Sequence, residues 1–504
     1  MGSFEGLLQG FQVAFSWEGI IFVFIGVLLG TIIGMIPGLG PISAIAIMIP
    51  ITYGMNPTIA LVMMAGVYYG SMYGGSTSSI LLNAPGVAGT VAAAFDGYPM
   101  AKQGKAGKAL AISAICSFVG GTVSVVLLML FAPMLASVAI YFGPPEYFAL
   151  MLLGLTAIAS LSDGSTLKAL TSAVLGFMVV TIGIDSQTGT TRFTFGSVNL
   201  LDGIDFLIVA LGVFALAEVC FLILNRKESM SGFKNIGSLK LSKSDFKEMT
   251  GPMTRQSFLG FLLGILPGAG ATISSFIAYI SEKRLAKKPE EFGKGSIKGL
   301  AAPETANNAA TSGAFVPLLS LGIPGSGTTA VMLGAFLVLG VQPGPLLMTE
   351  NPTVFWGVIA SMYIGNVFLL ILNLPLIPYF VKILAVPRPL LISLVIIFSM
   401  VGVYAVSFST FDLYLLVLFG ILGYLMRIFA FPAAPFILAF ILGGMMEQML
   451  RQSLTISDGS FMIFLQSPLA VSLFVFTLIA LIFPEWRKRR ANRKQQDNNR
   501  TIGM

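Results

Sequence analysis

From residue 17 to residue 483 the sequence is a succession of apolar stretches, separated by polar or glycine- and proline-rich breaks. Hydrophobic residues make up 56% of the 504 residues and charged residues only 10%, which leaves too few polar groups to cover a soluble protein of this size. Each helical crossing of a bilayer needs about 20 apolar residues, and a helix satisfies its own backbone in lipid. The chain is therefore predicted to be an all-α integral membrane protein with about 12 transmembrane helices.

Two absences narrow the chemistry available to the chain. It contains no histidine, which excludes a Ser-His-Asp triad and any histidine-ligated metal site. Cys116 and Cys220 lie far apart inside apolar runs, so neither a disulfide framework nor a CxxC metal site is available. The glycine-rich segments contain no Gly-x4-Gly-Lys-[Ser/Thr] phosphate loop. We expect no enzymatic activity, no bound cofactor and no ATP-driven pumping by this chain alone.

Positive charge is concentrated in three segments. Residues 226–256, 282–298 and 484–504 hold 20 of the 29 lysines and arginines. Each segment abuts an apolar stretch, which is the positive-inside pattern of cytoplasmic loops rather than a basic face for nucleic acid. The predicted organisation is a first membrane repeat over 1–225, a basic cytoplasmic loop over 226–256, a second repeat with additional spans over 257–483, and a basic cytoplasmic tail over 484–504.

The breaks in the apolar sequence recur at constant shifts. Five positions of the first half reappear 230 residues later and four more reappear 239 residues later: Gly30, Gly34, Pro37, Gly38 and Gly40 as Gly260, Gly264, Pro267, Gly268 and Gly270, and Gly74, Pro85, Gly86 and Thr90 as Gly313, Pro324, Gly325 and Thr329. This pattern predicts an internal duplication, with the two repeats oppositely oriented. In transporters, matching interrupted segments in two halves point to the binding site.

The segment 257–281 lies between two basic loops that should both be cytoplasmic. Two helical arms of about 10–12 residues reach only about half the hydrocarbon thickness. The pattern therefore predicts a re-entrant hairpin broken by glycine and proline, with its tip at Pro267–Gly270. The alternative is a plain spanning helix that leaves one basic loop outside.

A first polar cluster follows Gly74 and Gly75, which permit a departure from helix, and precedes the break at Pro85-Gly86. It consists of Ser76, Thr77, Ser78, Ser79 and Asn83. A helix N-terminus beside such hydroxyls binds carboxylates without arginine, so these residues are candidate substrate ligands. The alternative is that the hydroxyls only bond neighbouring helices together.

The corresponding cluster of the second half follows Pro324. Its residues are Gly325, Ser326, Gly327, Thr328 and Thr329. The glycines free the backbone, and the hydroxyls can cap the next helix. Two such tips, one from each half, are predicted to clamp an organic anion.

A third cluster combines a carboxylate with amides. Glu304, Asn307, Asn308 and Thr311 follow one face of a predicted helix. They are candidate ligands for a coupling cation such as sodium, together with Gly38, Gly40, Gly268 and Gly270 at the two Pro-Gly-x-Gly tips. The alternative is that Pro303 starts this helix, so that Glu304 merely stabilises its N-terminus.

Several of these strings are specific enough to suggest a family. They are Gly34-x2-Pro-Gly-Leu-Gly-Pro41, Tyr73-Gly-Gly75 with Ser78-Ser-Ile-Leu-Leu-Asn-Ala-Pro-Gly86, Asp96-Gly-Tyr-Pro99 and Ala302-Pro-Glu-Thr-Ala-Asn-Asn-Ala309. The chain resembles, over most of its length, the large membrane subunit of the tripartite tricarboxylate transporters (TctA type). Ser76-Thr77 stands where a citrate-type member carries Gly-Arg, and loss of that cation weakens the case for a tricarboxylate.

The resemblance implies a permease of the bacterial cytoplasmic (inner) membrane that works with a small four-span membrane subunit and an extracytoplasmic solute-binding protein. Such systems import di- and tricarboxylates on a sodium or proton gradient. Two rivals are a channel or facilitator lined by the Gly/Ser tips, and a membrane-embedded enzyme, which the lack of histidine and of clustered acids disfavours.

Overall fold

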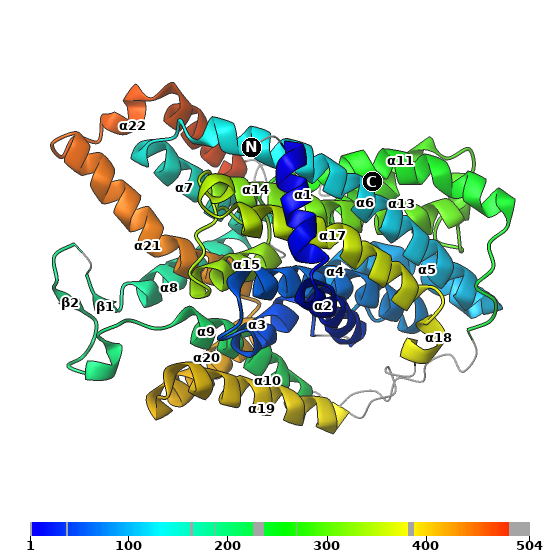
Figure 1. Cartoon of the computed structure of the whole chain (residues 1–504), viewed down its shortest axis with the longest axis horizontal. Helices are drawn as coiled ribbons and strands as arrows, with labels where there is room; N and C mark the ends of the chain where they lie inside the picture. The colour runs from blue at the N-terminus through cyan, green and yellow to red at the C-terminus, as the bar shows by residue number, and fades with distance from the viewer. Residues whose placement is uncertain are drawn as a thin grey trace, which may run out of the picture. The chain divides into compact units, whose positions relative to one another are not determined.

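A computed structural model describes residues 3–36, 39–161, 165–185, 187–224, 236–268, 270–381 and 388–482. Gly38, residues 226–235 of the basic loop and the predicted tail 484–504 lie outside the described residues. The described residues are almost entirely helical (Figure 1), which confirms the all-α prediction.

Within the described chain seven helices are long and apolar enough to cross a membrane: Trp17–Met35, Ala88–Ala139, Phe206–Leu224, Pro352–Asn373, Pro389–Ser407, Thr410–Ile428 and Ala433–Ile456. Shorter apolar helices accompany them, among them Pro41–Ile51 and Gly327–Val338. The chain is thus a multi-pass membrane protein. The total of about 12 crossings stays a prediction.

Contacts divide the chain into two compact units, Met1–Ile140 with Asp205–Ile428, and Tyr141–Ile204 with Phe429–Met504. Each unit takes segments from both predicted halves. The elements of the first unit are α1 Ser3–Ala14, α2 Trp17–Met35, α3 Pro41–Ile51, α4 Pro57–Leu82, η1 Ala88–Thr90, α5 Val91–Met100, η2 Ala101–Lys105, α6 Ala106–Ala139, α9 Phe206–Ala210, η4 Leu211–Leu216, α10 Ala217–Leu224, α11 Lys243–Ile265, α12 Gly270–Leu285, η5 Pro289–Glu291, α13 Ile297–Gly313, α14 Phe315–Leu321, α15 Gly327–Val338, α16 Leu347–Glu350, α17 Pro352–Asn373, α18 Ile377–Phe380, α19 Arg388–Ser407 and α20 Thr410–Ile428.

Helices α2 and α4 pack backbone to backbone along two facing glycine stripes. Small residues at every fourth position let helix backbones approach closely in lipid. A Cβ placed on Gly30 would collide with the carbonyl oxygen of Val67, and one on Gly70 with that of Val27. The glycines of the first predicted repeat therefore set the spacing between α2 and α4.

Helices α11 and α13 make the same kind of contact in the second half, where a Cβ on Gly260 would collide with the Ala306 carbonyl oxygen. The later Pro-Gly loops also make matching contacts in the two halves. A Cβ on Gly86 would collide with the carbonyl oxygen of Gly34. Gly325 corresponds to Gly86, 239 residues earlier, and Gly264 corresponds to Gly34, 230 residues earlier. The built Cβ of Gly325 lies 3.2 Å from the carbonyl oxygen of Gly264. Matching positions of the two halves thus make matching contacts, as a duplicated sequence would.

The predicted break at Pro267–Gly270 is present, because α11 ends at Ile265 and α12 begins at Gly270. The two helices form a hairpin, since the guanidinium of Arg255 donates two hydrogen bonds to the carboxylate of Glu282, at 2.9 and 2.8 Å. Between this ion pair and the tip, the arms 255–265 and 270–282 reach about 16–20 Å, less than the ~30 Å hydrocarbon core. The helices as a whole are longer than predicted, 23 and 16 residues. That the hairpin is re-entrant stays a prediction.

The second unit contains α7 Pro144–Leu161, α8 Thr166–Val180, β1 Gly183–Ile184, β2 Thr191–Arg192, η3 Val198–Leu200, α21 Ala433–Ile456 and α22 Ile463–Gln466. Strands β1 and β2 pair antiparallel, Gly183 with Arg192.

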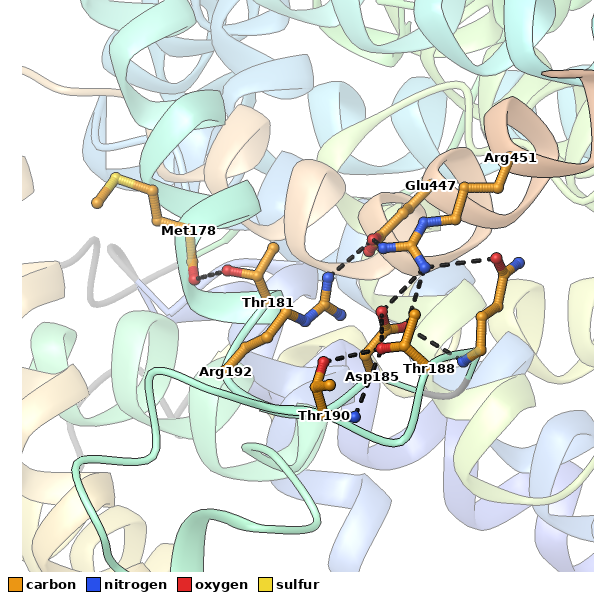
Figure 2. Close-up of polar contacts among 9 residues, drawn as sticks. Met178, Thr181, Asp185, Thr188, Thr190, Arg192, Glu447 and Arg451 are labelled. Carbon is orange, nitrogen blue, oxygen red and sulfur yellow. Dashed lines mark hydrogen bonds and ion pairs between the residues drawn. The ribbon is translucent and has the colours of Figure 1, made fainter. Parts of the chain in front are cut away.

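Charged side chains join this β-hairpin to α21, as Figure 2 shows. Arg451 contacts both Asp185, at 2.9 Å, and Glu447, and Glu447 also accepts from Arg192 at 2.8 Å. Glu447 and Arg451 are therefore part of a four-charge network rather than an isolated pair on one helix.

Candidate transport site

Helix α13 is the buried centre of the first unit, and all its residues from Gly299 to Gly313 are buried. Its N-cap Ser296 accepts a hydrogen bond from the Gly299 N–H at 3.3 Å. It packs against α4, α5, α6, α11 and α12. Gly120 on α6 brings the two backbones together, since a Cβ there would collide with the Thr305 carbonyl oxygen.

Glu304 lies in the third turn of α13, because the helix begins at Ile297 and Pro303 is inside it. The alternative in which Glu304 stabilises a helix N-terminus is therefore wrong. A proline lacks an N–H and is common in a first turn, but here the start is set seven residues earlier, at the cap Ser296. Glu304 is instead an interior carboxylate, 1% exposed.

Three serine hydroxyls donate to a single oxygen of that carboxylate. The Oε2 atom of Glu304 accepts from Ser76 at 2.8 Å, from Ser113 at 2.9 Å and from Ser117 at 3.0 Å. Among the described residues no lysine or arginine forms an ion pair with Glu304. Hydrogen bonds to a buried charge offset part of its desolvation cost, but a cation or a proton is still needed to neutralise it.

Three buried side-chain oxygens of α13 have no hydrogen-bond partner among the described residues, and neither has the amide nitrogen of Asn307. The oxygens are Oε1 of Glu304, Oδ1 of Asn307 and Oδ1 of Asn308. Asn307 and Asn308 are at most 1% exposed. Thr311, the fourth predicted ligand, donates to the Asn307 carbonyl at 2.9 Å. Buried polar atoms without partners are rare, and a row of them on one helix provides the oxygen ligands that a hard cation prefers.

The first predicted substrate cluster lies near the C-terminal end of α4, not at a helix N-terminus. The helix passes through Gly74 and Gly75 without interruption and ends at Asn83, which has a left-handed backbone with φ of 53°. The expected departure at the two glycines is therefore wrong, because glycine permits a break but does not impose one. Ser76, Thr77, Ser78 and Ser79 are all buried.

Two of these hydroxyls hold the segment after α4 in place. Ser78 accepts from the Gly86 N–H at 3.0 Å, and Ser79 shares a hydrogen bond with Thr90 at 2.8 Å. Thr77 bonds back to the Tyr73 carbonyl at 3.4 Å. Ser78 and Ser79 thereby fix the loop that leads to η1 and α5.

The second cluster does cap a helix, as its sequence predicts. Ser326 is the N-cap of α15, and it forms a reciprocal capping box with Thr329. Helix α15 packs against α3 and α4. Helix α15, from the second half, therefore meets helices of the first half.

The Pro-Gly-x-Gly tips lie against the later Pro-Gly loops in both halves. The Gly268 N–H donates to the Gly325 carbonyl at 2.9 Å, and the built Cβ of Gly40 lies 3.7 Å from the Gly86 carbonyl oxygen. Gly268 and Gly270 have φ of 82° and 52°, values that favour glycine. That these tips bind an ion stays a prediction.

Comparison with known proteins decides the family. Residues 20–438 match the sequence profile of the Tripartite tricarboxylate transporter TctA family. The chain belongs to the TctA family. This confirms the family resemblance and makes the protein a membrane-transport protein.

Two relatives of the TctA chain come from Agrobacterium vitis. One, described as "Uncharacterized 52.8 kDa protein in TAR-I ttuC' 3'region", is 45% identical over 97% of this chain and 98% of its own length. The other, "Uncharacterized protein in TAR-II ttuC' 3'region", is 44% identical over 47% of this chain and 98% of its own length. No solved structure matches the TctA chain.

Two residues of the site were missed by the sequence reasoning. Ser113 and Ser117 of α6 donate to Glu304, yet they lie within a long apolar run. Their spacing of four places both on one face of a helix, and two polar residues so spaced in an apolar span could have marked them. Among the described residues of this TctA protein, no group of three or more histidine, cysteine or acidic side chains is placed to hold a metal.

Proposed function

We propose that this chain is the large permease subunit of a solute-binding-protein-dependent secondary transporter. It imports di- or tricarboxylate-type organic anions, driven by a sodium or proton gradient. Its partners are a small four-span membrane subunit and an extracytoplasmic solute-binding protein. Membership of the TctA family supports the tripartite organisation, and the two halves are proposed to be oppositely oriented repeats.

The observation that carries the proposal is the hydrogen bond between Ser76 and Glu304, at 2.8 Å. Ser76 belongs to the cluster predicted to bind substrate, and Glu304 to the cluster predicted to bind the coupling ion. The two residues are 228 positions apart and come from different halves. A direct contact between the two clusters is a physical route by which binding at one can bias the other.

The buried carboxylate explains why transport would require the ion. Moving the site across the membrane with an unpaired Glu304 carries an uncompensated charge through a low-dielectric environment, which is strongly unfavourable. A sodium ion at the free oxygens of Glu304 and Asn308, or a proton on the carboxylate, removes that cost. The ion thereby permits the change of access, and the gradient of the ion drives uptake.

For the organic anion we propose the region where the two Pro-Gly loops adjoin helix starts. Helix α15 begins beside Ser326, and its N-terminus attracts carboxylates through free N–H groups and the helix dipole. The side of the anion site opposite the α15 N-terminus would be formed by the first cluster, Ser76, Thr77, Ser78, Ser79 and Asn83. Ser78 and Ser79 would contribute by holding the loop that ends at Gly86, as much as by contact with the anion.

The test is uptake by cells that express the chain with its two partner subunits. Glu304→Gln removes the charge but keeps the shape, and Glu350→Gln is the matched control, because Glu350 is exposed. We expect Glu304→Gln to abolish the dependence of carboxylate uptake on sodium and on pH, or to shift it at least tenfold, at equal membrane abundance. Glu350→Gln should leave both unchanged. Normal ion dependence in Glu304→Gln would remove this residue from the coupling site.

A further inference from the structure

A cavity of about 510 Å³ opens beside the C-terminal end of α12. One wall is aromatic, formed by Phe95 of α5 and by Phe276 and Tyr279 of α12. Two cations, Lys283 and Arg284, line the same cavity. None of these residues belongs to the clusters proposed above for the anion or the coupling ion.

The two cations have no acidic partner within the part of the chain that the structure describes. Among the described residues neither Lys283 nor Arg284 forms an ion pair, and both side chains are exposed. By contrast, the preceding residue of α12, Glu282, forms an ion pair with Arg255. The cavity therefore presents uncompensated positive charge next to an apolar wall.

The surroundings of the cavity are apolar and open. Phe95 is 41% exposed, Ile280 48% and Leu285 65%. In a membrane protein, exposed apolar side chains of this kind face acyl chains, and lysines and arginines at helix ends reach toward the headgroups. A ligand that fits both features has an anionic head and an apolar tail.

The aromatic wall is held rigidly. The Tyr279 hydroxyl donates to the carboxylate of Asp96 at 3.0 Å. The Tyr279 ring packs edge-on against Phe95, with centroids 5.3 Å apart, and against Phe292 at 5.5 Å. A preformed wall lowers the entropic cost of binding.

We propose that this cavity binds an anionic phospholipid. Its phosphate lies between Lys283 and Arg284, and an acyl chain follows the wall formed by Phe95 and Phe276. The exposed apolar border connects the cavity to the bilayer, and this connection favours a lipid over a small soluble anion.

The test measures binding of phosphatidylglycerol to the purified full chain in detergent, by native mass spectrometry and by the midpoint of thermal unfolding. Phosphatidylcholine serves as the neutral comparison. We expect saturable binding and a raised midpoint with phosphatidylglycerol only. The double variant Lys283→Gln/Arg284→Gln should bind it roughly 30-fold more weakly, given the contribution of each cation near an anionic lipid.

Two controls separate this site from general attraction to the basic loop. Lys287→Gln/Lys294→Gln removes two exposed cations of the same loop that do not line the cavity, and it should bind phosphatidylglycerol like the unmodified protein. Phe276→Ala keeps both charges and should weaken binding by removing part of the acyl wall. Equal losses in the two charge variants, no loss in Phe276→Ala, or equal stabilisation by inorganic phosphate would each overturn the proposal.

Discussion

Ser117 provides the sharpest test of how the Glu304 carboxylate is stabilised. Its hydroxyl donates to Oε2 of Glu304 at 3.0 Å from the middle of α6. Ser117→Ala removes this donor and leaves those of Ser76 and Ser113 in place. The matched control is Ser124→Ala on the same helix, because Ser124 is equally buried but bonds only to the Gly121 carbonyl, at 3.4 Å.

The expected size follows from the chemistry of the bond. A hydrogen bond to a charged group is worth about 1.5–3 kcal/mol. Since three donors share one oxygen, we take the lower end for the loss of one, about 1.5 kcal/mol, or roughly tenfold in a binding constant. The lost donor destabilises the ionised carboxylate, which is the form that binds a metal cation.

Which of the two profiles shifts, that against sodium or that against pH, identifies the coupling ion. If sodium is coupled, a proton competes more strongly for the less stabilised carboxylate, and the sodium concentration for half-maximal uptake should rise by up to roughly tenfold in Ser117→Ala. If a proton is coupled, the less stabilised carboxylate takes up its proton more readily, and the pH profile of uptake should move upward by about one unit.

The assay is initial uptake in membranes with equal transporter content, against sodium and separately against pH. An identical shift in Ser124→Ala, or no shift of either profile in Ser117→Ala, would refute the assigned role of the three serines.

Two further predictions concern stability of the purified protein in detergent. Gly30→Ala should lower the midpoint of thermal unfolding by the equivalent of about 1–3 kcal/mol, because a Cβ there meets a backbone carbonyl. The control is Gly444→Ala, which should leave the midpoint unchanged or slightly raised because nothing lies within 4 Å of its Cβ; equal losses in the two variants would contradict the packing argument. The hydrogen bond from the Gln187 backbone N–H, and then those from the Thr188 hydroxyl and Arg451, lower the pKa of Asp185 from 3.8 to about 2. The stability that the ionised Asp185 contributes is therefore complete above about pH 4 and is lost as the pH falls toward 2. The difference in midpoint between the unmodified protein and Asp185→Asn should stay constant from pH 7 to 5 and shrink only below pH 4; closure of that difference already at pH 5 would contradict the assigned pKa.

Local features of the site could be predicted from the sequence because they depend on nearby residues. The break at Pro267–Gly270 follows from glycine and proline, and the cap at Ser326 with Thr329 follows from their spacing. The repeat shifts relate positions whose backbone contacts recur in the two halves, such as Gly325 with Gly264 and Gly86 with Gly34.

Features that depend on tertiary contacts could not be predicted in this way. Ser117 and Glu304 are 187 residues apart, and nothing local links an apolar run to a distant acid. The alternative that Pro303 starts α13 is wrong for a similar reason. Pro303 resembles a first-turn proline, but the helix begins earlier, where Asp96 from α5 accepts the N–H groups of Gly293, Gly295 and Ser296.

Helix α13 is therefore held by the first half at two levels. At its N-terminal end the buried Asp96 binds the turn that leads into the cap Ser296. Eight residues further on, about 12 Å along the helix axis, the serines of α4 and α6 bind Glu304. Sliding α13 against these helices would leave two buried carboxylates without donors, at a cost of several kcal/mol. We therefore expect α4, α5, α6 and α13 to move as one body during transport.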